Sequence, residues 1–419
     1  MAGAVSLKGF LGASLSIKGP GLTNALPGIA NNFFENRPAL SISERFEDGS
    51  EKAHKRVDHD ALLRPLVKAR GRQGSDLEVL WHRARIEPCG PVHQDLCEGG
   101  EIVVEADPYR LDPDDYRKSK RPSILLGGAA LRKGVDFSGV NVPVFTTATA
   151  KGLLDESLPQ SAGVFTGVGL ENTCEPMTVA GDCVICVQVY DHELLSPPPR
   201  AKHITLNGVD ELLSFLDGKE WGLPVIEKTK RQLSEFNMDA WLPYQAFDHL
   251  SALPWHHDVV VDVGLFSVVG EHVWRASPDR GFYGSLNSRY MGTAIPTAIG
   301  LGAVSKKPIF CVTGDGGSNM YLTEARIAAN RSMPICFVIM SDGRYGSIAQ
   351  SSSELYQDAV NISAPDHRVF ETFGIETHQA FSFNSFAHYV DTWDRESPLA
   401  IFCSFDQDRY ATMTRGLRR

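Results

Sequence analysis

The last third of the chain alternates short apolar runs with polar segments that contain glycine. Buried strands are predicted at Ile309–Val312 and Ile335–Met340, and a helix from Ser318 to about Arg331 lies between them. The segment Gly314-Asp315-Gly316-Gly317 follows the first run, and the acidic loop Ser341–Arg344 follows the second. Strand, helix and strand in this order predict a βαβ unit within a parallel sheet.

Both acidic loops are expected at one edge of that sheet, because the carboxyl ends of parallel strands meet there. Asp315 and Asp342 are 27 positions apart in the sequence, yet this topology brings them together. Carboxylates suit Mg²⁺, which takes its remaining ligands from phosphate and water. Gly316 and Gly317 allow close approach of the backbone, and the following helix favours an anion. The residues alone also allow a plain βαβ unit with capping aspartates.

The same alternation continues through the rest of the chain and predicts an α/β protein. We expect three Rossmann-like domains with parallel sheets flanked by helices, at residues 1–105, 106–225 and 226–419. In the first block, a glycine-proline-glycine turn at 19–21 precedes a helix over 25–36 that Thr23 or Asn24 is expected to cap.

Composition narrows the classes of function. The 419 residues carry a formal net charge of −10, which argues against a general nucleic-acid binder. No apolar run approaches the roughly 18–20 residues of a membrane span. The mildly apolar N-terminus leaves a signal peptide open as an alternative, although no clear charged segment precedes it.

The cysteines favour a reduced, cytoplasmic protein. Cys183 and Cys186 form the only close pair among eight cysteines and lie in an apolar, strand-like run. Strand geometry points their side chains to opposite faces, which favours buried structural thiols over zinc or redox chemistry.

Taken in order, the motifs resemble those of the thiamine-diphosphate-dependent enzymes. They are GPGLTNA at 19–25, MGTAIPTAIG at 291–300, GDGG at 314–317 and SDGRYG at 341–346. The resemblance covers nearly the whole chain and is to the acetohydroxyacid synthase, benzoylformate decarboxylase and pyruvate decarboxylase group. Where the family signature has two asparagines, this chain has Ser341 and Asp342, and the aspartate keeps an oxygen ligand at the metal position.

The resemblance implies a set of site residues. Asp315, Asp342 and the main-chain carbonyl of Arg344 would hold Mg²⁺, and the metal would hold the diphosphate. The remaining cofactor-binding positions are Gly19, Pro20 and Gly21 on the pyrimidine side and Gly314, Gly316, Gly317 and Tyr345 on the diphosphate side. Met291 takes the place of the bulky side chain that wedges beneath the cofactor; without the resemblance, a core methionine is the simpler interpretation.

The implied activity is that of a decarboxylase or carboligase, a lyase or transferase, acting on a 2-oxo acid in the manner of acetolactate synthase. The family's active site lies between two subunits, so a homodimer or homotetramer is expected, with no nucleic acid or membrane partner. Some members carry FAD in the middle domain, which the glycine pair at 127–128 alone does not support. Gln350–Asn361 is expected to contribute to a lid.

Four histidines lie in segments that are relevant to a site. His54 or His59 is a candidate substrate contact, because family members place residues that face the active site in this region. His256 and His257 are expected to be loop residues without a catalytic role.

One departure from the family is large. The glutamate that activates the cofactor normally precedes the glycine-proline-glycine turn, but residues 1–34 contain no Asp or Glu, and Glu35 is the first acidic residue. The first domain is therefore expected to be incomplete, with an exposed sheet edge and reduced stability. Three explanations stay open: a fragment or internal start, one part of a split enzyme, or a degenerate member. The alternative function is a non-catalytic cofactor-binding or regulatory homologue.

Overall fold

The computed structural model describes residues 1–46, 56–98, 101–105, 113–168, 173–234, 240–349, 360–363, 365–406 and 408–410. The chain divides into two compact units. The first unit is Met1–Arg110 with Ala303–Ser305, and the second unit is Leu111–Gly302 with Lys306–Arg419. Three mostly parallel sheets flanked by helices confirm the predicted α/β class. The three domain boundaries and the incompleteness of the first domain stay predictions. No helix among the described residues is long and apolar enough to cross a membrane.

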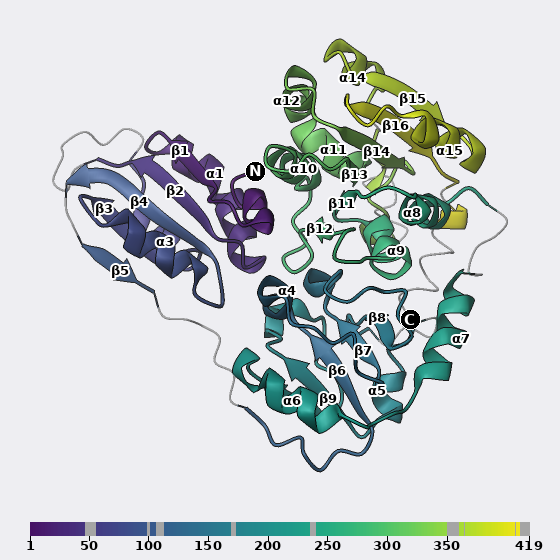
Figure 1. Cartoon of the computed structure of the whole chain (residues 1–419). Coiled ribbons are helices and arrows are strands. Elements are labelled where there is room, and N and C mark those ends of the chain that lie inside the picture. Colours follow the sequence, from purple (N-terminus) through teal and green to yellow (C-terminus); the bar gives the residue numbers. More distant parts are fainter. Residues whose placement is uncertain are drawn as a thin grey trace. The chain divides into compact units, whose positions relative to one another are not determined.

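The first unit holds a five-stranded sheet of order β1-β2-β4-β3-β5, drawn in purple and blue in Figure 1. Its strands are β1 (Ala13–Ser16), β2 (Ala39–Glu44), β3 (Ala69–Gln73), β4 (Pro91–Glu98) and β5 (Ile102–Val104). All neighbours pair in parallel except β3 and β5, which are antiparallel and depart from the expected all-parallel sheet. β1 lies at the edge, and three of its four residues are exposed.

Helices cover both faces of this sheet. They are η1 (Ala4–Lys8), α1 (Pro20–Phe34), α2 (His59–Leu63) and α3 (Leu77–Arg85). Leu80 of α3 packs with Leu40 and Val92 on one face, whereas α1 and α2 pack together on the other through Leu22 and Leu63.

The start of α1 corrects one prediction. The helix begins at Pro20, with Gly19 as its N-cap at φ 68°, so the expected cap by Thr23 or Asn24 is wrong. Proline lacks an N–H and has a helical φ, which suits the first helical position. Thr23 already lies inside the helix, and its hydroxyl donates to the Pro20 carbonyl.

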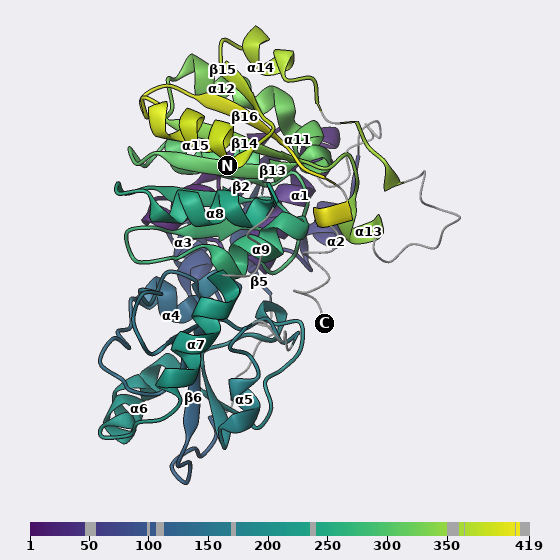
Figure 2. The ribbon, with the colours of Figure 1, turned by 90° about the vertical axis from the view of Figure 1, so that its right-hand side faces the viewer.

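The second unit begins with a parallel sheet of order β10-β9-β6-β7-β8. Its strands are β6 (Pro122–Leu126), β7 (Val144–Thr146), β8 (Ser161–Val164), β9 (Cys183–Val187) and β10 (Ala201–Ile204). The α-helices of this part are α4 (Gly128–Lys133), α5 (Met177–Ala180), α6 (Val209–Leu216) and α7 (Leu223–Ser234), labelled in Figures 1 and 2. The 3₁₀ helices are η2 (Ala148–Ala150), η3 (Asp191–Glu193) and η4 (Leu206–Gly208). Cys183 packs in the cluster beneath α4 and α6, and Cys186 in the cluster beneath α5 and α7, which confirms that they point to opposite faces.

A six-stranded parallel sheet completes the second unit, with the order β12-β11-β13-β14-β16-β15. Its strands are β11 (Asp258–Val261), β12 (Phe282–Gly284), β13 (Ile309–Gly314), β14 (Ile335–Ser341), β15 (Glu376–Ala380) and β16 (Leu399–Ser404). The helices are α8 (Pro243–Ala252), α9 (Leu265–Val273), α10 (Ala294–Gly302), α11 (Asp315–Tyr321), η5 (Leu322–Glu324), α12 (Ala325–Asn330), α13 (Gly346–Ala349), α14 (Arg368–Thr372) and α15 (Phe383–Thr392).

Two features of this sheet determine where a ligand can bind. The single helix predicted over 318–331 is divided into α11, η5 and α12, and it begins earlier, at Asp315. After β11 the chain adds β12 on one side and then crosses to add β13 on the other. The strand order therefore reverses between β11 and β13, and open α/β sheets bind ligands in the crevice at such a point.

Candidate functional site

Asp315 and Asp342 lie at the carboxyl ends of neighbouring strands, as predicted. Asp315 follows β13 and Asp342 follows β14, and the two strands pair in parallel up to Gly314 opposite Met340. Asp315 is buried, and its Oδ2 accepts a hydrogen bond from the Gly343 N–H at 2.8 Å. Its other oxygen, Oδ1, is buried with no hydrogen-bond partner among the described residues.

The electrostatics of this pair favour a cation. Burial raises the pKa of the Asp315 carboxyl above its ordinary value. Burial, with a contribution from the charge of Asp315, raises the pKa of Asp342 to about 6. The buried Asp315 and the half-buried Asp342 repel each other, and one oxygen of Asp315 is unpaired among the described residues, so they form a donor set that a hard divalent cation would stabilise.

Gly316 and Gly317 are required by close packing. A Cβ on Gly316 would lie 2.4 Å from Cε1 of Tyr345 and 2.9 Å from Cε of Met291. A Cβ on Gly317 would lie 2.4 Å from Oδ2 of Asp262. The backbone at the start of α11 is therefore bare on the side that faces these groups. The structure brings Met291 and Tyr345, both predicted site residues, beside Gly316.

Asp262, directly after β11, is a site residue that the sequence analysis missed. It is buried, and its Oδ1 accepts the N–H groups of Val263 at 2.7 Å and Gly292 at 2.9 Å. Its Oδ2 accepts the Thr313 hydroxyl at 3.0 Å, and burial raises its pKa to about 6. Asp262 thus ties the turn after Met291 to the end of β13. The signal available in the sequence is a polar residue directly after the apolar run Val259–Val261.

The loop after Asp342 is held by a second segment. Gly343 has a φ of 71°, and its carbonyl accepts from the Ile362 N–H at 2.9 Å. Tyr345 donates its N–H to the Val360 carbonyl at 2.8 Å, and Arg344 forms an isolated bridge with Asn361. The role of the Arg344 carbonyl as a metal ligand stays a prediction. Residues 350–359 of the predicted lid lie outside the described residues.

The glycine-proline-glycine turn and the histidines lie outside the two acidic loops. Gly19, Pro20 and Gly21 belong to the first unit, at the start of α1. His59 begins α2 and is buried, whereas His54 lies outside the described residues. His256 and His257 precede β11 as expected, and His257 packs against the rings of Trp255, Trp274 and Phe310.

Comparison with known proteins shows what the region that holds these residues is similar to. Residues 262–389 match the family model of the C-terminal TPP binding domain of thiamine pyrophosphate enzymes. This match and the curated relatives support the predicted resemblance to the thiamine-pyrophosphate-dependent enzymes. The chain is 23% identical to a probable acetolactate synthase large subunit of Methanocaldococcus jannaschii, over 91% of this chain and 78% of the relative. It is 22% identical to the acetolactate synthase large subunit of Corynebacterium glutamicum, over 85% and 68%, and 23% identical to acetolactate synthase isozyme 3 large subunit of Escherichia coli, over 89% and 79%.

The matched region contains every site residue of the second unit discussed above. It begins at Asp262 and includes Met291, Asp315 and Asp342. The residues present also fit a thiamine pyrophosphate enzyme physically. The unpaired Oδ1 of Asp315 suits a metal, and the N-terminus of α11, which begins at Asp315, suits an anion such as a diphosphate.

Proposed function

We propose that this chain is a thiamine-pyrophosphate-dependent enzyme that requires Mg²⁺ and acts on a 2-oxo acid as a decarboxylase or carboligase. The observation that carries the proposal is the unpaired, buried Oδ1 of Asp315 beside Asp342, at the point where the strand order reverses. The similarity to acetolactate synthase large subunits supports the class of reaction.

In this proposal the chain's own residues bind the metal and orient the cofactor. Asp315 and Asp342 hold Mg²⁺ through side-chain oxygens, and Arg344 holds it through its carbonyl. The main chain at Gly314, Gly316 and Gly317 approaches the diphosphate. Thiamine diphosphate, when bound, supplies a carbon nucleophile and an electron sink for decarboxylation.

Met291 and Asp262 act together on the cofactor's position. Met291 offers an apolar side chain beside Gly316 and keeps water from that side of the cofactor. The turn that carries Met291 is fixed by the Gly292 N–H, which donates to the buried Asp262. Asp262 is therefore a positioning residue, because it sets where Met291 stands relative to α11.

The absence of acidic residues from positions 1–34 favours a second candidate, a non-catalytic cofactor-binding or regulatory homologue. Residues 1–34 of the chain offer no carboxylate ahead of Gly19 to assist the cofactor's proton transfer. The main proposal also implies a homodimer or homotetramer, since the family's sites lie between subunits.

One assay separates the two candidates. The purified full chain is supplied with thiamine diphosphate, Mg²⁺ and a panel of 2-oxo acids including pyruvate, and released CO₂ is measured. Turnover that needs both additions and is lost in Asp315→Ala supports the main proposal. Cofactor binding without turnover of any acid supports the homologue, and failure to bind the cofactor contradicts both. Size-exclusion chromatography tests the oligomer, and flavin absorbance of the purified protein tests for FAD.

A further inference from the structure

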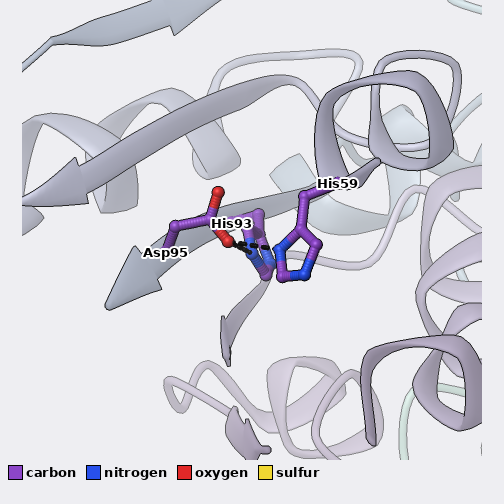
Figure 3. A group of neighbouring side chains, drawn as sticks. All are labelled: His59, His93 and Asp95. Atoms are coloured by element: carbon purple, nitrogen blue, oxygen red, sulfur yellow. Dashed lines mark hydrogen bonds and ion pairs between the residues drawn. The ribbon is translucent and has the colours of Figure 1, made fainter. Parts of the chain in front are cut away.

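The first unit contains three buried, metal-ligating side chains that the proposed function does not use. His93 and Asp95 lie two residues apart on β4, so they project from the same face of the sheet. His59 is the first residue of α2. Figure 3 shows both imidazole rings directed at the Asp95 carboxylate. The residues His59, His93 and Asp95 are 2%, 0% and 4% exposed.

The distances are close to those of a coordination sphere. Asp95 Oδ1 lies 2.6 Å from His59 Nδ1 and 3.0 Å from His93 Nε2, and one ligand atom from each residue lies within 4.8 Å of the others. Metal–nitrogen and metal–oxygen bonds of about 2.0–2.2 Å place neighbouring ligands of a tetrahedral zinc roughly 3.3 Å apart. The two contacts would therefore open by only about 0.3–0.7 Å to admit an ion.

The surrounding groups hold the carboxylate in position for this role. Asp95 Oδ2 accepts from Arg45 at 3.0 Å, which leaves Oδ1 for the ion, and metal-ligating carboxylates are commonly hydrogen-bonded in this way. Arg45 also pairs with Asp60 at 2.9 Å, and Arg70 pairs with Asp60 and Glu105. Three carboxylates thus surround two guanidinium groups, and this network accommodates an added cation.

Both imidazoles present a ring nitrogen to the same carboxylate oxygen, Oδ1 of Asp95. The Nε2 atom of His93 faces Asp95 and lies 3.4 Å from the Ser43 hydroxyl, which makes Nε2 the ligating nitrogen.

We propose that His59, His93 and Asp95 form a binding site for a divalent transition-metal ion of the zinc class. Two imidazole nitrogens and one carboxylate oxygen are a donor set for zinc or ferrous iron, with the fourth position open to water. Mg²⁺ prefers oxygen ligands, so the donor set distinguishes this site from the one at Asp315 and Asp342.

The test uses the full chain stripped with a chelator, with Mg²⁺ present throughout. Zinc chloride is titrated, and metal retained after desalting is measured by mass spectrometry. We expect one zinc per chain, and a loss of affinity of more than about 100-fold in His59→Gln and His93→Gln, exceeding the 10–100-fold typical of outer-shell partners. His249→Gln is the matched control, because His249 also pairs with an aspartate, Asp391 at 3.1 Å, and it should leave zinc binding unchanged.

X-ray absorption at the zinc edge of the wild-type protein decides the matter even if a variant does not fold. Nitrogen and oxygen ligands with two imidazoles support the site, whereas sulfur at about 2.3 Å would assign the zinc to cysteines and overturn the proposal. The proposal is equally overturned if folded His59→Gln retains zinc as tightly as the wild type, or if the wild type retains none.

Discussion

Replacing Gly317 by alanine tests whether α11 packs as closely on Asp262 as the structure indicates. The new Cβ would lie 2.4 Å from Oδ2 of Asp262 and 2.9 Å from Oγ1 of Thr313. Neither side chain can yield easily, because Asp262 is buried and its oxygens accept from Thr313 and from two backbone N–H groups. Either α11 moves away from β11, or Asp262 gives up a hydrogen bond.

The opposing contributions can be compared. Alanine is favoured over glycine inside a helix by about 1 kcal/mol. Overpacking a close contact costs about 1–3 kcal/mol, and a lost hydrogen bond to a charged group costs about 1.5–3 kcal/mol. Either cost, less the gain in helix propensity, leaves a net destabilisation of up to about 2 kcal/mol. At roughly 2–4 °C per kcal/mol for a large unit, the melting temperature should fall by up to about 4–8 °C.

Differential scanning fluorimetry of the full chain measures this change, and calorimetry then measures the affinity for thiamine diphosphate. Gly28→Ala is the matched control, because Gly28 lies in α1 and its added Cβ would meet no heavy atom within 4 Å. The control should melt at or above the wild-type temperature. If Gly317→Ala melts with the wild type and keeps its cofactor affinity, the packing described between α11 and Asp262 is wrong.

Three further predictions concern charge. Burial lowers the pKa of His257 to about 4 from its usual 6.5, so the unfolded chain takes up this proton first as the pH falls, and His257 accounts for a stability loss of about 2 kcal/mol between pH 7 and pH 5. His257→Gln should reduce the dependence of the urea midpoint on pH between pH 7 and pH 5. An unchanged pH dependence would contradict this role of His257. Lys151 Nζ lies 2.6 Å from both oxygens of Glu156. Lys151→Met leaves the Glu156 carboxylate without its cation, so the free energy of unfolding measured in urea should fall by about 3–5 kcal/mol. The double variant Lys151→Met with Glu156→Leu should recover part of this loss. If Lys151→Met and the double variant are equally stable, the ion-pair account is refuted. Asp342→Asn keeps an oxygen ligand and removes a like charge, so calorimetry should still detect cofactor binding in Mg²⁺; Asp342→Leu should abolish it, and retention there would exclude Asp342 as a ligand.

The βαβ unit around Asp315 was predictable because local signals agree there. Apolar runs mark β13 and β14, and the glycines between them mark the turn into α11. Asp262 was not predictable in the same way, since its partners Gly292 and Thr313 lie 30 and 51 positions away. Its role depends on which strands become neighbours, and the sequence does not contain that information locally.

The first unit shows the same limit. The pairing of β5 against β3 in the antiparallel direction leaves no mark in a three-residue apolar strand. The spacing of His93 and Asp95 on β4 is visible in the sequence. The position of His59 beside Asp95 depends on how α2 packs against the sheet. The predicted start of α1 at residue 25 is wrong, because the helix already begins at Pro20, ahead of the apolar positions that predicted it.

The most direct measurement is a calorimetric titration of thiamine diphosphate into the full chain, with Mg²⁺ and with EDTA, for the wild type and Asp315→Ala. Circular dichroism confirms that the variant is folded. The account predicts saturable binding to the wild type only in Mg²⁺, and none to Asp315→Ala under either condition. Binding of equal affinity to the folded variant, or binding by the wild type that EDTA does not weaken, would contradict it.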